Sequence, residues 1–397
     1  MHGPTSSMAR SLALSAAVWG FSTLAWGASW QVLMVGLRDD PRHDRTRIEQ
    51  AYPGHPIGRP LAAAQVAADE SRAVLDAAGH QLKLQSLEWD GQSIAALVTE
   101  LSKRGPHYLL LDLPLAQQKA VMAAYASLQS RPIVFNIAEG SDELRGASCH
   151  PQWLHTLPSE RMRADALAQW LAARGWRDVL WLVGPRPADA VLRDVWQASF
   201  KRYGLRVKAE REFVLSGDPR QRDQGNPRLL TAEPAHDAVV VLDTDGEFAR
   251  GLPYNTAQPR PVVGHGGLAA LAWHPRWERY GAPQLSRRFQ RHAGRPMVGH
   301  DWAAWVAVKS IAAVLEDQPR ASLAQQLQAL RSGAVAVDGF KGGTVRFRPW
   351  DGQMRQPVFL ARGDGVAAVA PLDGAMHPRD VLDTLGADDG DSACKRR

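Results

Sequence analysis

The stretch AWHPRWERYGAPQL, residues 272–285, combines aromatic rings and positive charge at close spacing. It places two indoles, an imidazole, two guanidinium groups and a phenol within eight positions: Trp273, His274, Arg276, Trp277, Arg279 and Tyr280. Indole faces beside guanidinium groups suit a planar, negatively charged ligand. We therefore nominate Trp273 as a stacking wall and His274 as a partner for a carboxylate. The alternatives are ordinary packing of a buried indole and a structural hydrogen bond of the imidazole.

The motifs of several large enzyme classes are absent. The sequence contains no G-x-S-x-G elbow, no H-E-x-x-H pair and no P-loop. The segment DTDGE, residues 243–247, fails the spacing of a calcium loop, and GHGG, residues 264–267, lacks the Rossmann glycine spacing. We expect no catalytic residue, no metal site and no enzyme activity.

The N-terminus indicates export. Arg10 precedes the apolar run LALSAAVWGFSTLAW, which ends in small residues near Gly27. This pattern predicts a signal peptide over residues 1–27, and the run is short for the alternative, a membrane anchor. We expect the mature chain to begin at about Ala28 and to be soluble and monomeric.

Charge and cysteine content exclude further classes. Lys and Arg number 47 against 41 Asp and Glu, a net charge of +6, and the basic residues are scattered rather than grouped in a stripe. We therefore exclude nucleic-acid binding. The two cysteines, Cys149 and Cys394, show no zinc-binding spacing, and in an oxidising compartment they permit one disulfide.

Buried strands alternate with amphipathic helices along most of the chain. Strands are predicted at 30–37, 108–113, 132–135, 178–184, 205–213, 238–243, 261–264, 344–348, 357–361 and 366–370. Helices are predicted at 60–79, 93–104, 115–129, 159–175, 187–203, 282–293, 300–316 and 322–332. This order, which begins again near residue 155, predicts an α/β fold of two doubly wound parallel-sheet lobes facing a cleft.

Several blocks carry a family resemblance. They include FN followed by DELRGASC (135–149), LHTLPSERMRADALAQWL (154–171), LPYNTAQPRPVVG (252–264), RFRPWDGQMRQP (346–357) and LDTLG (382–386). With them the chain resembles type I periplasmic solute-binding proteins of the Leu/Ile/Val-binding superfamily. It is most similar to substrate-binding proteins associated with PQQ-dependent alcohol dehydrogenase systems. The resemblance implies a periplasmic location, a small-molecule ligand, an ABC permease as partner and a disulfide between Cys149 and Cys394.

The resemblance also implies how the lobes are divided. Three crossovers would fall near 150–157, 268–274 and 337–343. Lobe 1 would comprise 28–154 and 272–338, lobe 2 would comprise 155–271 and 339–385, and 386–397 would form a polar tail. The stretch around Trp273 would then border the cleft. This subfamily departs from the amino-acid binders where those hold the ligand's ammonium and carboxylate, so we do not expect an amino acid.

Ligands of open α/β sheets meet the loops at the carboxyl ends of the strands. These loops, the crossovers and a helix start supply the candidate ligand-binding residues: Arg38, Asn136, Glu139, His155, Thr156, Ser159, Arg186, Asp243, Thr244, Trp273, His274 and Trp302. A cap, a turn or a solvated charge is the alternative for any one of them. Ser159, for example, could cap the helix that follows it.

We expect a periplasmic binding protein of an ABC importer that closes over a small aromatic anion, needs no cofactor and serves PQQ-dependent alcohol oxidation. PQQ itself is one candidate ligand, with Trp273 or Trp302 as the wall and Arg38, His155, Arg186 and His274 for its carboxylates. A sensor or scaffold of the same fold, or a binder of an alcohol-derived acid, is the alternative.

Overall fold

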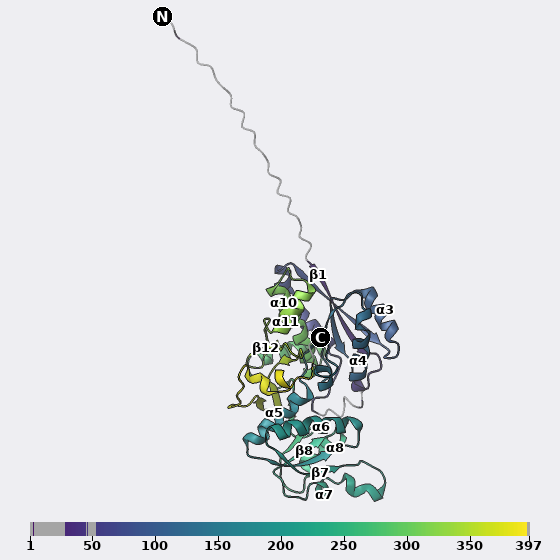
Figure 1. Cartoon of the computed structure of the whole chain (residues 1–397), viewed down its shortest axis with the longest axis vertical. Coiled ribbons are helices and arrows are strands. Elements are labelled where there is room, and N and C mark those ends of the chain that lie inside the picture. The colour runs from purple at the N-terminus through teal and green to yellow at the C-terminus, as the bar shows by residue number, and fades with distance from the viewer. Residues whose placement is uncertain (1–2, 4–27, 45, 47–52, 395–397) are drawn as a thin grey trace.

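The computed structural model describes Gly3, residues 28–44, residue 46 and residues 53–394. The predicted signal peptide therefore lies outside the described residues, apart from Gly3. Figure 1 shows two α/β units, one above the other.

The first unit is built on a five-stranded sheet of order β2-β1-β3-β4-β5, in which every pair is parallel. Its strands are β1 (Ala28–Leu37), β2 (His80–Trp89), β3 (Tyr108–Asp112), β4 (Ile133–Asn136) and β5 (Trp153–His155). The helices α2 (Leu61–Ala77), α9 (Ala282–Ala293), α10 (Gly299–Asp317) and α11 (Leu323–Ser332) contribute to one core. The helices α3 (Ile94–Arg104) and α4 (Leu115–Ala124) contribute to the core on the other face. Both faces are apolar because both are covered.

The second unit contains a four-stranded parallel sheet of order β7-β6-β8-β9. Its strands are β6 (Asp178–Val183), β7 (Arg206–Glu212), β8 (Ala238–Leu242) and β9 (Val262–Gly264). The helices α5 (Glu160–Ala173) and α6 (Pro187–Arg202) pack in one core. Leu230 and Phe248, from α7 (Pro227–Leu230) and α8 (Glu247–Gly251), pack in the other.

Two small antiparallel sheets complete the described chain. One contains β10 (Ala269–Leu271), β14 (Val358–Arg362) and β15 (Gly365–Ala370), and the other contains β11 (Val337–Asp338), β12 (Thr344–Phe347) and β13 (Met354–Arg355). Short 3-10 turns lie at Pro41–His43, Tyr125–Ser127, Asp142–Arg145, Pro219–Gly225, Leu252–Tyr254, Val381–Thr384 and Asp389–Asp391.

The C-terminal segment packs in both units. Phe347 and Met354 lie in the core of the first unit, whereas Val358 and Leu360 lie in that of the second. Phe359, between them, packs in the core of the first unit, so side chains of β14 contribute to both cores. The lobe boundaries, with the third crossover at 337–343, therefore stay a proposal.

The α/β class and the parallel sheets are confirmed, with local differences. The strand β2 was not predicted, although part of HQLKLQSLEW alternates polar and apolar residues as a half-buried strand does. The helix expected over 115–129 ends at Ala124 and continues as a 3-10 turn. No helix in the described ranges is long and apolar enough to cross a membrane.

The blocks that carried the resemblance form a buried network beside the first passage between the units. Arg348 and Asp351 of FRPWDGQ pair at 2.7 Å, and both are buried. Gln353 donates to the carbonyls of His155 and Leu157 and accepts from Arg145 at 2.7 Å. These residues hold the backbone of the passage in place.

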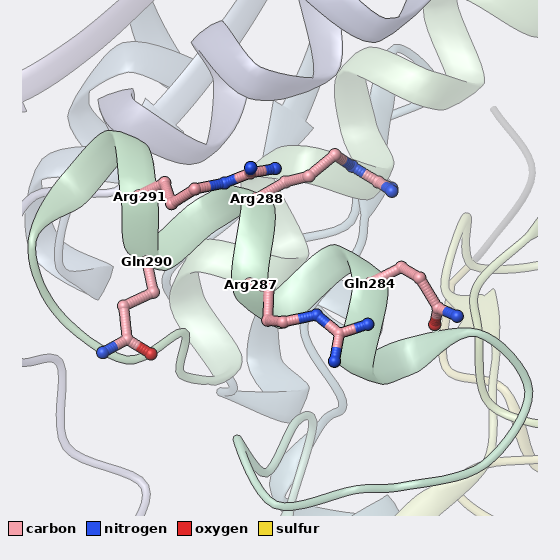
Figure 2. Close-up of a pocket in the computed structure, with 5 residues that line it drawn as sticks. All are labelled: Gln284, Arg287, Arg288, Gln290 and Arg291. Atoms are coloured by element: carbon pink, nitrogen blue, oxygen red, sulfur yellow. The ribbon is translucent and has the colours of Figure 1, made fainter.

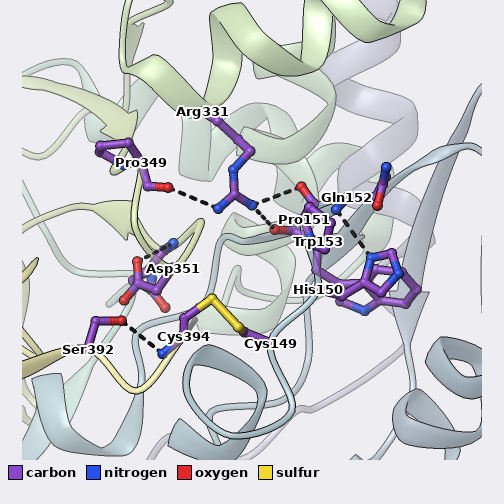
Figure 3. Close-up of a disulfide and its surroundings, with 11 residues drawn as sticks. Cys149, His150, Pro151, Gln152, Trp153, Arg331, Pro349, Asp351, Ser392 and Cys394 are labelled. Carbon is purple, nitrogen blue, oxygen red and sulfur yellow. Dashed lines mark hydrogen bonds between the residues drawn. A yellow bond between two sulfur atoms is a disulfide. The ribbon is translucent and has the colours of Figure 1, made fainter. Parts of the chain in front are cut away.

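The predicted disulfide between Cys149 and Cys394 is confirmed, and it spans a sequence separation of 245 residues. Figure 3 shows its surroundings, where Arg331 donates to the carbonyls of Pro151 and Pro349. The disulfide therefore ties the C-terminal tail to the loop that precedes β5.

Candidate ligand-binding site

A cavity of about 230 Å³ lies where segments of both α/β units meet. Its lining comes from residues 53–57, from Leu157 and Arg163 around the start of α5, from residues 271–275, from residues 296–300 at the start of α10, and from the turn between β14 and β15. Much of the lining is apolar, with Ile57, Leu157 and Leu271 among its side chains. A cavity with an apolar wall and a few convergent polar groups is the usual form of a small-molecule site.

Trp273 forms the aromatic wall of the cavity. Its side chain is 2% exposed, and its ring is stacked on that of Trp302 with the centroids 6.5 Å apart and 10° between the planes. Phe359 packs against the same ring at 6.1 Å. These contacts fix the orientation of the indole at the border of the cavity.

Arg163 brings positive charge from the second unit. Ser159 caps α5 by accepting a hydrogen bond from the N–H of Met162, and this places Arg163 in the first turns of the helix. The Nη1 atom of Arg163 lies 3.4 Å from Glu160 Oε1. Arg362, the last residue of β14, adds a second and exposed guanidinium to the lining.

The first turn of α10 lines the cavity through Val298, Gly299 and His300. The first N–H groups of a helix have no partner within it and carry a partial positive charge, which favours an anion. A Cβ on Gly299 would lie 3.1 Å from the Cβ of Ala272, so glycine lets this turn approach the Trp273 segment closely.

His300 is buried against a charged cluster of the first unit. Arg42 contacts Asp112 at 3.0 Å. Burial of Asp112 opposes ionisation, but His43, whose Nε2 lies 3.6 Å from Asp112 Oδ2, and the charge of Arg42 lower its pKa to about 2. Burial, together with the charge of Arg42, lowers the pKa of His300 to about 3. The imidazole of His300 is therefore neutral at physiological pH.

Three buried nitrogen atoms of the lining have no hydrogen-bond partner among the described residues: Arg163 Nε, Trp273 Nε1 and His300 Nδ1. Leaving a buried polar group unpaired costs about 1–3 kcal/mol, so such groups are rare unless a ligand or water satisfies them. Within the described part of the chain, no Asp or Glu lines the cavity. The cavity is therefore suited to a ligand that accepts hydrogen bonds and carries negative charge.

Comparisons with known proteins identify the fold. No family model and no curated protein matches the sequence. The structure resembles an ABC transporter substrate-binding protein from Sphaerobacter thermophilus, with a TM-score of 0.67 and 17% identity over 86% of this chain and 98% of that one. It also resembles a Leu-, Ile-, Val-, Thr- and Ala-binding protein from Brucella ovis, with a TM-score of 0.64 and 14% identity over 84% and 89%.

A further match is a solute-binding protein of an ABC transporter from R. palustris in complex with benzoate. Its TM-score is 0.61, with 13% identity over 93% of this chain and all of that one. The chain has the fold of type I periplasmic binding proteins. At these identities the likeness establishes the fold alone.

Of the twelve residues nominated from the sequence, Trp273 and His274 line the cavity. Burial lowers the pKa of His274, and its Nδ1 accepts a hydrogen bond from the N–H of Arg276 at 3.2 Å. Trp302 lies behind the wall, where its Nε1 donates to the carbonyl of Gly339. Of the two tryptophans that the sequence offered as alternative walls, only Trp273 lines the cavity.

The nominated residues around the first passage are bonded to one another. The amide of Asn136 accepts from Gln118 and from the N–H of Glu139 and contacts His155 Nδ1 at 3.0 Å. The hydroxyl of Thr156 donates to the carbonyl of Asn136. Burial raises the pKa of Glu139, whose carboxylate accepts from the N–H of Ser141. These contacts favour a structural role for the group, and Ser159 is a helix cap.

The remaining nominated residues also lie outside the cavity lining. Arg186 pairs with Asp245 at 2.6 Å on the surface of the second unit. Asp243 accepts from the N–H groups of Asp245 and Ala249, and the N–H of Thr244 donates to Asp189. Arg38 is exposed at the end of β1.

Sequence reasoning missed Arg163, His300 and Arg362. The signal for Arg163 was present, because SERMR places it one turn after a helix cap that follows a predicted crossover. His300 is the first residue of the helix predicted over 300–316, so it could have been found by asking which helix begins at the cleft. No sequence pattern marks Arg362.

A larger surface hollow of about 510 Å³ lies over α9. Figure 2 shows that its five lining residues extend from a single helix and do not converge on one point: Gln284, Arg287, Arg288, Gln290 and Arg291. Because all of the lining among the described residues comes from one helix, this surface lacks the convergent walls of a small-molecule site. Within the described ranges, no group of three or more His, Cys, Asp or Glu could hold a metal ion.

Proposed function

We propose that this chain is the solute-binding protein of an ABC-type importer and holds a small aromatic carboxylate in the cavity beside Trp273. The observation that carries the proposal is the lining itself. The guanidinium groups of Arg163 and Arg362 belong to the lining of a largely apolar cavity that also includes the indole of Trp273 and no described carboxylate. A ligand whose carboxylate accepts hydrogen bonds and whose ring stacks on Trp273 would satisfy all of these features.

The charge of the lining argues against an amino acid as ligand. The ammonium group of an amino acid needs a carboxylate or several carbonyl acceptors, because a buried cation without them is strongly destabilised. The described lining provides Arg163 and Arg362 but no Asp or Glu. The benzoate held by the R. palustris protein is an example of the expected class of ligand on the same fold.

PQQ is the second candidate, favoured by the FRPWDGQ and LRG-x-x-C blocks of the sequence. It is a tricyclic quinone with three carboxylates. Binding all three carboxylates would need more cationic groups than the two arginines of the cavity lining provide. The cavity, at about 230 Å³, is also below the roughly 300–1,000 Å³ of sites for drug-sized ligands. We therefore place a single-ring acid first and keep the link to alcohol oxidation as a proposal.

Titration of the purified mature protein tests these candidates. Tryptophan fluorescence and calorimetry would be followed during addition of benzoate, leucine and PQQ in separate experiments. Saturable binding of benzoate without binding of leucine supports the proposal. Saturable binding of PQQ alone would favour the second candidate, and binding of leucine alone would contradict both.

We further propose that the chain is exported, loses residues 1–27 and acts as a monomer with a membrane permease as partner. Intact mass and gel filtration of periplasmic protein test export, cleavage and monomer. Uptake of labelled ligand in cells with and without this chain separates transport from a sensor or scaffold role, because only transport requires uptake to fall.

A further inference from the structure

Lys341, in the loop between β11 and β12, is buried beside the aromatic cluster that supports the cavity wall. Its side chain is 2% exposed. The Nζ atom lies 3.4 Å from the centroid of the Trp302 ring and 5.4 Å from that of Phe359. A lysine this deeply buried is uncommon and calls for a physical explanation.

The surroundings of Nζ match the three N–H donors of an ammonium group. Nζ donates to Gln356 Oε1 at 2.8 Å and to the carbonyl of Pro357 at 3.3 Å, and the face of the Trp302 ring takes the third side. The amide of Gln356 is oriented by its own hydrogen bond from Nε2 to the carbonyl of Thr156 at 2.7 Å. A neutral amine, with two N–H groups and a lone pair, would direct that lone pair at one of these acceptors.

This cation has no compensating negative charge nearby. Within the part of the chain that the structure describes, no Asp or Glu forms an ion pair with Lys341. Burial lowers the pKa of Lys341 well below the ordinary value for lysine, with no carboxylate to oppose the effect, so the two oxygen acceptors and the face of the Trp302 ring are what favour the ammonium form. A positive charge that is desolvated and unpaired acts over a longer distance than one in water, because the protein interior screens it less.

The cavity borders the same aromatic cluster through Trp273. Trp302, on which Lys341 rests, is stacked with Trp273, and Phe359 contacts both the lysine and the Trp273 ring. A ligand packed on Trp273 is therefore separated from the ammonium group by aromatic side chains rather than by water.

We propose that Lys341 determines specificity: its buried, unpaired charge behind the Trp273 wall makes the cavity prefer anionic over neutral aromatic ligands. This inference rests on the proposed function, because it assumes that an aromatic acid occupies the cavity. Arg163 would bind the carboxylate directly, whereas Lys341 would act on it through the wall. Lys341 would thus raise affinity for the anion without touching it.

The test compares benzoate with benzamide, which has the same ring and nearly the same shape but no charge. The measured quantity is the ratio of their affinities, by calorimetry, in wild type and in Lys341→Met. Methionine has a similar length and no charge. We expect the preference for benzoate to fall at least about fivefold in the variant, while the affinity for benzamide stays within about twofold.

Lys309→Met is the matched control. Lys309 also lies over a tryptophan, at 6.0 Å from the Trp305 ring, but it bonds to Ser71 on α2 and is not part of the Trp273 cluster. Its removal should leave the ratio unchanged. If Lys341→Met does not fold, Lys341→Gln is measured instead, since it is also neutral and keeps an N–H donor for Gln356.

If the ratio of benzoate to benzamide affinity is the same in the neutral variant as in wild type, the proposed role of Lys341 is wrong. Binding of benzoate by wild type would in that case still support the proposed function. An equal loss of affinity for benzoate and benzamide would also contradict the proposed role of Lys341, because that result indicates a merely structural role. If wild type binds neither benzoate nor benzamide, both the inference and the proposed function fail.

Discussion

The indole rings of Trp273 and Trp302 are nearly parallel and stacked, yet of the two only Trp273 lines the cavity. Trp302 is fully buried and is anchored by its hydrogen bond to the carbonyl of Gly339. A ligand wall that is itself packed against a fixed ring loses little conformational entropy on binding. In the proposed site, Trp273 would therefore contact the ligand and Trp302 would hold Trp273 in place.

Replacing Trp273 by alanine should lower the affinity for benzoate at least about tenfold, or about 1.4 kcal/mol, because the stacking surface is removed. Trp273→Phe should lose less, since it keeps a ring on the support of Trp302. Calorimetry of both variants checks this. Trp181→Phe, which alters a buried indole in the core of the second unit, is the control. Unchanged affinity in Trp273→Ala would contradict the assignment of the wall.

Arg163→Met should weaken benzoate binding by about tenfold or more, because a charge-assisted hydrogen bond to the carboxylate is lost. Arg161→Met is a close control on the same helix, since Arg161 pairs instead with Asp391 at 3.2 Å and does not line the cavity. Binding measured under the same conditions should be unaffected in the control. Equal affinities in the two variants would remove Arg163 from the site.

The sequence was sufficient to predict most of the fold. Strands such as YLLLDL, residues 108–113, are continuous apolar runs, which is the pattern of a parallel sheet covered on both faces. The edge strand β2 was missed because most of its side chains are at least partly exposed, so it lacks the continuous apolar run of the other strands. The lobe boundaries stay a prediction, because residues 344–354 pack with residues distant in sequence and no local pattern reports such packing.

The site was harder to predict than the fold. The aromatic stretch revealed Trp273 and His274, because their residue types alone suit a ligand. Asn136 sits at the end of a strand, where a ligand contact is reasonable, yet its hydrogen bonds all go to the protein. Whether a polar side chain is already satisfied depends on neighbours far away in sequence. Arg163 shows the converse, since its unpaired Nε is visible only once the helix is packed.

Asn136→Ala should therefore reduce stability and spare binding. Removing a buried amide that bonds to Gln118, to Glu139 and to His155 leaves partners unsatisfied, at about 1–3 kcal/mol for each such group. Urea denaturation should show a lower free energy of unfolding, while the affinity of the folded fraction for benzoate stays within about twofold. If Asn136→Ala lowered the affinity for benzoate without lowering the free energy of unfolding, Asn136 would be a ligand-binding residue after all.

The disulfide between Cys149 and Cys394 should stabilise the chain without contributing to binding. It closes a loop over a sequence separation of 245 residues. Chain-entropy estimates for loops of this size approach about 5 kcal/mol, although measured gains are often smaller. We expect Cys149→Ser with Cys394→Ser to melt at lower temperature and to bind benzoate as wild type does. Thiol titration of the unreduced, unfolded wild type should find no free cysteine, and two titratable thiols would contradict the bond.

His300 should make the protein sensitive to mild acid. Its folded pKa of about 3 lies below the roughly 6.5 of an unfolded histidine, so the unfolded state takes up a proton first. The stability that the neutral imidazole contributes is thus fully present above about pH 6.5 and is lost as the pH falls toward 3. We expect His300→Asn to lose less free energy of unfolding than wild type when the pH is lowered from about 7 to about 5. His292→Asn, on the exposed face of α9, is the control and should follow wild type. Urea denaturation at the two pH values measures the difference. A loss as large in His300→Asn as in wild type would show that His300 is not among the groups that take up protons on unfolding.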